Sequence, residues 1–142
     1  MTPAPNILLW SAATWLLVIP LAVANGVLRQ AVLIPWLGTK LAYPISGALL
    51  IAAIAAVACL LVSRLGPRHA MVWVSIGIAW GTATFCFELL MLRAANKGWD
   101  ALVQQYNFSD NNIWPLVMVW TLLAPLLVAT WRKQVQASTA SY

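Results

Sequence analysis

The sequence predicts an all-α membrane protein, with four transmembrane helices in a bundle and a short extracytoplasmic interfacial helix. Two observations favour this fold. Hydrophobic residues make up 63% of the chain and charged residues only 8%, whereas a soluble domain is nearer half apolar and a quarter charged. In addition, four apolar segments separated by Pro or charged residues each approach the roughly 20 residues needed to cross a bilayer. A soluble core of this size could not hide so much apolar surface, so the exterior is expected to face lipid.

The whole chain, residues 1–142, is predicted to form a single transmembrane domain. The four spans are expected at residues 7–28, 41–62, 70–92 and 113–131. Residues 93–112 form the longest connection, and residues 134–142 form a polar tail. The first connection contains Pro35 and Gly38, which interrupt helices.

An interfacial helix is expected within residues 93–112. Trp99, Leu102, Val103 and Tyr106 recur at the spacing of one helical face, which is typical of a helix lying flat at the membrane surface. The polar stretch that follows supplies capping side chains for the last span, and Asp110 is expected to be such a cap.

The tryptophans agree with this arrangement, because the amphipathic indole prefers the boundary between water and lipid. Six of the nine are expected near that boundary: Trp10, Trp73 and Trp131 on the side of the termini, and Trp36, Trp99 and Trp114 on the opposite side. The other three, Trp15, Trp80 and Trp120, are expected to lie deeper.

The net charge of +5 does not indicate nucleic-acid binding, because the eight Lys and Arg residues lie in ones and twos at segment ends and form no basic stripe. They are typical of topology signals and lipid headgroup contacts. Arg64, Arg68, Arg132 and Lys133 share the side of the termini, whereas Arg29, Lys40, Arg93 and Lys97 lie opposite. The tighter clustering of the first set favours cytoplasmic termini in a multi-pass protein of the bacterial inner membrane.

Small residues mark two helix faces. In the third span, Gly77 and Gly81 lie on the same face as Glu88, and small residues four apart allow another helix to approach closely. In the second span, Ala48, Ala52 and Ala56 form a similar row. These faces predict close contact between the second and third spans, or contact with a second copy or another membrane protein.

Glu88 is the one acid inside a predicted span, and an isolated charge in hydrocarbon costs several kcal/mol. Arg29 should lie at a similar depth near the end of the first span, so an Arg29–Glu88 pair is expected. One interpretation is a clamp that fixes the register of two helices. The other is a polar site open to the extracytoplasmic face, formed with Asn25 and covered by Trp99, Tyr106 and Asn107.

No motif for catalysis, for a metal or for a cofactor occurs. The single histidine, His69, has no neighbouring ligand in sequence, and zinc needs typically three or four ligands. Nothing else places a nucleophile beside a base or pairs two carboxylates. The chain is therefore expected not to be an enzyme.

Several stretches, "NGVLRQAVLIPWLG", "FCFELL", "GWDALVQQYNF" and "IWPLVMVWTLLAPLL", resemble a family of small uncharacterised bacterial four-helix membrane proteins. The resemblance carries over to Asn25, Gly26, Arg29, Phe87, Glu88, Trp99, Leu102, Tyr106 and Asn107. Gln30 stands where members of that family often have an acid. The resemblance implies architecture and no activity.

Two functions follow as expectations. The first is a non-enzymatic accessory or scaffold protein that contacts membrane lipids and a second copy or another membrane protein. The alternative is a small transporter or channel with a polar site built on Arg29 and Glu88.

Overall fold

The computed structural model describes residues 6–108 and 111–139, and over these ranges the chain is helical with no strand. The elements are α1 (Ile7–Leu28), the π-helical turn η1 (Arg29–Leu33), α2 (Ile34–Leu65), α3 (Ala70–Ala94), α4 (Trp99–Gln105) and α5 (Trp114–Thr139). Helix α5 continues beyond Trp131 into the segment that was expected to be a polar tail.

Polar side chains begin three of these helices. The Asn6 carboxamide accepts hydrogen bonds from the backbone N–H groups of Leu8 and Leu9, and Asn112 accepts one from Trp114. His69 Nδ1 accepts from the backbone N–H of Met71, so this histidine caps α3. Each cap satisfies a donor that the first helical turn leaves unpaired. Asp110, the expected cap, lies outside the described residues.

The chain reverses direction at Gly38. This glycine has φ 73° and ψ 166°, a left-handed conformation that costs glycine little because it has no Cβ. Helical hydrogen bonding otherwise runs almost without interruption from α1 through η1 into α2. Ile7–Leu65 is therefore one apolar helical stretch that folds back on itself, and Ala70–Ala94 and Trp114–Thr139 are two more that are long and apolar enough to cross a membrane.

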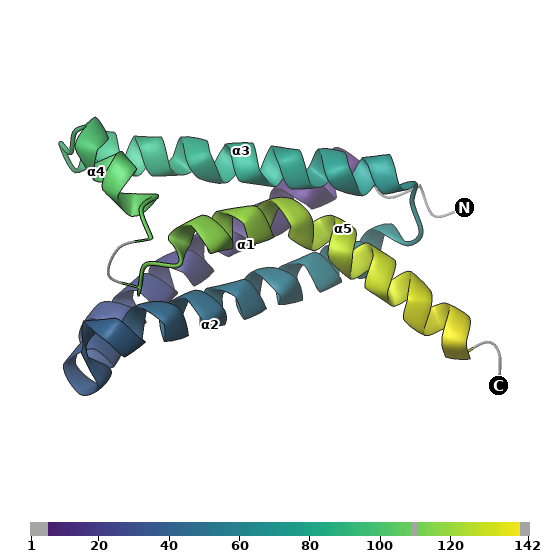
Figure 1. The fold of residues 1–142 in the computed structure, drawn as a ribbon. Helices are drawn as coiled ribbons and strands as arrows, with labels where there is room; N and C mark the ends of the chain where they lie inside the picture. Colours follow the sequence, from purple (N-terminus) through teal and green to yellow (C-terminus); the bar gives the residue numbers. More distant parts are fainter. Residues whose placement is uncertain (1–5, 109–110, 140–142) are drawn as a thin grey trace.

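The helices form two antiparallel hairpins, α1–α2 and α3–α5, that lie side by side (Figure 1). In the first hairpin, Asn25 near the end of α1 donates to Ser46 near the start of α2 at 2.9 Å. At its other end, the Arg64 guanidinium lies 5.2 Å from the ring centre of Trp10. The hairpins meet mainly where α2 packs against α5.

The three tryptophans expected to lie deep in the bundle all donate hydrogen bonds between helices. Trp80 donates to the backbone carbonyl of Ser11 and Trp15 to the Thr84 hydroxyl, both at 3.1 Å. Trp120 donates to the carbonyl of Ile51 at 3.0 Å. An indole therefore supplies both apolar bulk and one directed bond in the interior. These bonds join α1 to α3 and α2 to α5, and the helices of each pair run in the same direction.

The core lies between the hairpins and the exterior is apolar. Trp80, Leu61 and Ile54 are at most 2% exposed. Large hydrophobic side chains such as Leu8 and Leu90 are 81% and 65% exposed and recur along every long helix. Exposed apolar surface on this scale is typical of a protein that contacts lipid or other protein.

The predicted partner of the glycine face is wrong. Gly77 and Gly81 are buried against Leu122 of α5, and a Cβ at position 77 would overlap the main-chain carbonyl of Leu122. The row of Ala48, Ala52 and Ala56 is exposed on α2, so it does not meet this face within the chain. Small residues showed where a helix can approach closely, but α5 takes that place because α3 and α5 form one hairpin.

Candidate functional site

The Glu88 carboxyl group lies at the α4 end of the bundle and is held by residues of the α4 segment. Glu88 is 7% exposed, in agreement with the prediction that it faces the packed side of the third span. Its Oε1 accepts a hydrogen bond from Gln105 Nε2 at 3.0 Å, and its Oε2 accepts one from the Tyr106 hydroxyl at 2.5 Å. This cluster of Glu88, Gln105 and Tyr106 fastens α4 to α3.

The predicted Arg29–Glu88 pair is not formed. The hydrogen bonds of Glu88 come from Gln105 and Tyr106, while the Arg29 guanidinium lies 5.0 Å from the ring centre of Tyr43. Arg29 begins η1 and Glu88 belongs to α3, on different hairpins. A similar depth along the bundle therefore did not bring the two side chains together, because α4 folds back over the end of α3 and supplies uncharged partners.

Tyr106 lies outside the long helices, at the end of α4. Burial raises the pKa of its hydroxyl well above the usual value, and the neighbouring Glu88 carboxyl group raises this pKa further. Both effects disfavour a second negative charge beside the carboxylate. Tyr106 therefore stays a hydrogen-bond donor throughout the neutral range.

Asn112 ties α4 to the beginning of α5. Its Nδ2 donates to the backbone carbonyls of Gln105 at 2.6 Å and Asn107 at 3.0 Å, while its Oδ1 caps α5. One carboxamide thus fixes the position of α4 relative to α5, and Glu88 fixes it relative to α3.

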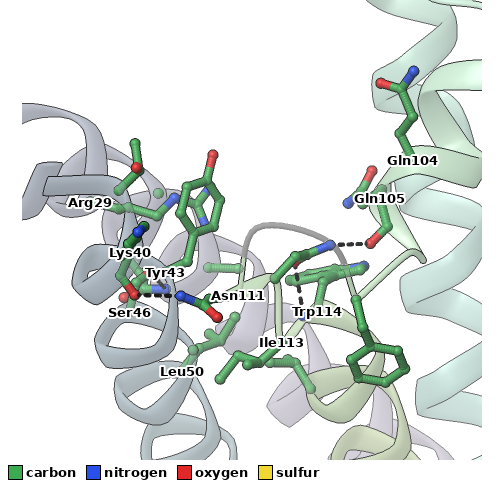
Figure 2. A pocket seen from close by; sticks show the side chains of 18 of the residues that line it. Arg29, Lys40, Tyr43, Ser46, Leu50, Gln104, Gln105, Asn111, Ile113 and Trp114 are labelled. Carbon is green, nitrogen blue, oxygen red and sulfur yellow. Dashed lines mark hydrogen bonds between the residues drawn. The ribbon is translucent and has the colours of Figure 1, made fainter.

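A polar pocket of about 1100 Å³ lies beside α4. It is enclosed by the C-terminal end of α1, the N-terminal part of α2, helix α4 and the start of α5. Arg29, Lys40, Tyr43 and Ser46 lie on one wall, and Gln104 and Gln105 lie on the opposite wall (Figure 2). Leu50 and Val117 line the deeper part and belong to the hydrophobic core. The volume slightly exceeds the roughly 300–1,000 Å³ typical of small-molecule sites.

The charge of the pocket lining is positive. Arg29 and Lys40 line it, and no aspartate or glutamate does so among the described residues. The Arg29 side chain has the Tyr43 ring as its neighbour, and no hydrogen bond or ion pair of this guanidinium occurs in the described part of the chain. A half-buried cation without a counter-ion raises the local affinity for anions.

Several residues that line the polar pocket have buried polar atoms without a hydrogen-bond partner. In the described residues, the buried side-chain polar atoms without a hydrogen-bond partner are Asn25 Oδ1, Arg29 Nε and Trp114 Nε1. All three residues line the polar pocket. Such an atom costs about 1–3 kcal/mol when it is left unpaired. The Trp114 indole also lies close to Glu88 and Tyr106, so Asn25 Oδ1 and Arg29 Nε are the unpaired atoms that are separate from the Glu88 cluster.

No family model matches the chain, and no curated protein or solved structure matches it. The family resemblance noted from the sequence therefore rests on the short motifs that suggested it.

The structure divides the predicted polar site into two parts. Asn25 and Arg29 line the polar pocket, whereas Glu88 and Tyr106 belong to the neighbouring cluster. Trp99 and Asn107 are exposed and line no part of the pocket.

Sequence analysis missed Lys40, Tyr43, Ser46, Gln105 and Asn112. Tyr43 and Ser46 lie inside a predicted span beside Lys40, and polar groups in such a position could have suggested a site. Gln105 and Asn112 had no comparable signal.

In the described residues, no group of three or more His, Cys, Asp or Glu side chains could hold a metal ion.

Proposed function

We propose that the chain is a four-span protein of the bacterial cytoplasmic membrane, with α1, α2, α3 and α5 crossing the bilayer. The termini face the cytoplasm, and α4 lies at the extracytoplasmic surface. The apolar exterior and the reversal of the Ile7–Leu65 stretch at Gly38 support four crossings. Helix α4 exposes Trp99 and Val103, which suits a short helix at the membrane boundary.

Its role in this proposal is that of a non-enzymatic accessory protein that binds a ligand in the polar pocket. One observation carries the proposal: Arg29 and Lys40 line the pocket with no acid among its described lining residues, and Asn25 and Arg29 each have a buried polar atom without a partner there. In a protein that only packs against other helices, these unpaired atoms would lower the stability of the fold without any gain in binding.

The packed interior of the bundle favours a ligand-binding protein over a channel or transporter. Between the pocket and the opposite end of the bundle, the space between the helices is occupied by buried side chains that include Trp80, Trp73 and Leu61. A channel or transporter needs a polar path or an alternative packing of these side chains. The alternative of a transporter built on Arg29 and Glu88 also loses the pairing on which it was based.

Native mass spectrometry of the full chain, purified from its source membrane in mild detergent, tests the proposal. Gly26 lines the pocket and has open space around it, so Gly26→Phe should obstruct the cavity. Ala24 is exposed on the same helix, and Ala24→Phe is the matched control. We expect a bound mass on the wild type and on Ala24→Phe, and its loss on Gly26→Phe.

Two results would contradict this role. The first is a wild-type protein that carries no bound mass. The second is wild-type protein in liposomes that conducts ions or solutes in a flux assay, because conduction would restore the transporter alternative.

A further inference from the structure

We propose that the ligand of the polar pocket presents a phosphate group and, next to it, a hydrogen-bond donor such as a hydroxyl or an ammonium group. This inference rests on the proposed binding function and names the class of ligand. The charge of the pocket and the identity of its unpaired atoms carry it.

Among the described residues, Arg29 is the arginine with a buried N–H group that has no partner. Arg68 donates through Nε to the backbone carbonyl of Leu65, and Arg132 donates to the Ser63 hydroxyl. Arg29 instead lies against the Tyr43 ring with its Nε buried and unpaired. The ring holds the guanidinium in place and leaves its N–H groups available, which is the arrangement suited to binding an oxyanion.

The charge of the pocket also favours a phosphate group. Arg29 Nε is a donor without a partner, and a phosphate group offers several acceptor oxygens to such a donor. Lys40 is exposed on the same lining, so the pocket presents two positive charges that attract a negative occupant. A neutral sugar or an apolar molecule would leave both charges uncompensated.

Asn25 requires the opposite chemistry. Its Nδ2 donates to Ser46 at 2.9 Å, so its amide donors already have one partner while Oδ1 is buried without any. That oxygen needs a donor. A fully ionised phosphoester group has no O–H to donate, whereas a glycerol hydroxyl or an ammonium group linked to the phosphate does supply a donor.

Two sources share this chemistry: the headgroup of a membrane phospholipid and a free phosphate ester from solution. Three probes distinguish them: 1-palmitoyl-2-oleoyl phosphatidylglycerol, diacylglycerol with the same chains, and glycerol 1-phosphate. Binding to the delipidated full chain in detergent is measured by native mass spectrometry and by the shift in melting temperature.

The key variant is Arg29→Gln. Its matched control is Arg93→Gln, because Arg93 is exposed and lies outside the lining of the polar pocket. We expect at least one phosphate-bearing probe to bind the wild type and Arg93→Gln equally, and to bind Arg29→Gln at least tenfold more weakly. Diacylglycerol should not bind in the pocket. A preference for phosphatidylglycerol identifies a lipid ligand, and a preference for glycerol 1-phosphate identifies a soluble one.

Equal binding of the phosphate probes to wild type and Arg29→Gln would overturn the inference, as would diacylglycerol binding as well as phosphatidylglycerol. Binding of neither phosphate probe would also overturn it. If the protein from its source membrane nevertheless carries a phosphate-free mass that Gly26→Phe removes, the binding function stands and only the ligand class is wrong. If that mass is absent as well, both proposals fail.

Discussion

The Tyr106 hydroxyl donates to Glu88 Oε2 at 2.5 Å, and this bond links the end of α4 to the one acid buried in a long helix of the described chain. Gln105 occupies the other carboxyl oxygen. The acid therefore has uncharged partners, and no acid accompanies Arg29 and Lys40 among the described residues of the pocket lining. Three consequences can be measured, and the α3–α5 contact gives a fourth prediction.

Tyr106 and Glu88 should be energetically coupled. A double-mutant cycle with Tyr106→Phe and Glu88→Ala, based on unfolding free energies in detergent micelles, should give a coupling of about 1–2 kcal/mol, because each substitution removes the same hydrogen bond. Asn107→Ala is the control, because Asn107 is exposed. A Tyr106 coupling no larger than that of Asn107 would show that the bond does not hold α4.

Arg29 and Glu88 should be energetically independent. The cycle of Arg29→Gln and Glu88→Gln, measured in the same way, should be additive within about 0.5 kcal/mol, because the two side chains share no partner. Favourable coupling well above that value would restore the ion pair that the depth argument predicted.

Stability should fall at alkaline pH because of Tyr106. Its pKa is raised in the folded protein above the ordinary value of 10.0, so above pH 10 the unfolded chain loses this proton before the folded protein does. The stability that Tyr106 contributes is thus complete below pH 10 and is lost as the pH rises toward the folded pKa. Melting temperatures in detergent between pH 8 and pH 11 should fall more steeply for wild type than for Tyr106→Phe. Parallel curves would contradict the assignment.

Gly77→Ala should destabilise the α3–α5 contact. The added methyl group would overlap the main-chain carbonyl of Leu122, and a backbone atom cannot move aside as a flexible side chain can. We expect a loss of about 1–3 kcal/mol in unfolding free energy, the usual cost of overpacking. Gly26→Ala is the matched control, because nothing lies within 4 Å of its Cβ position. Equal stability of the two variants would show that the helices can separate without cost.

The sequence predicted where the helices lie along the chain better than which helices pack against one another. Each apolar segment overlaps one long helix, although α2 and α5 extend beyond the expected spans, and the spacing of Gly77, Gly81 and Glu88 identified a packed face. The identity of the helix that covers this face was wrong, because small residues permit close approach by any helix. Likewise, the positions of Arg29 and Glu88 along their helices suggested a similar depth. They did not reveal toward which neighbouring helix each side chain points.

The polar pocket could not be predicted for a related reason. Its lining comes from five separate elements, and the position of α4 on one side of it is set by the hydrogen bonds of Glu88 and Asn112. The order of residues in the chain does not reveal such a gap, which depends on how a short segment folds back after a long helix. Only Asn25 and Arg29 of the lining were singled out, because polar groups near the end of an apolar span are conspicuous.

The reversal at Gly38 has a consequence for biogenesis. The first hairpin pairs Asn25 with Ser46 within itself, so two of its polar groups are satisfied before any later residue is synthesised. Residues 7–65 can therefore pack as one unit during synthesis, and the second hairpin then has a preformed surface on which to assemble.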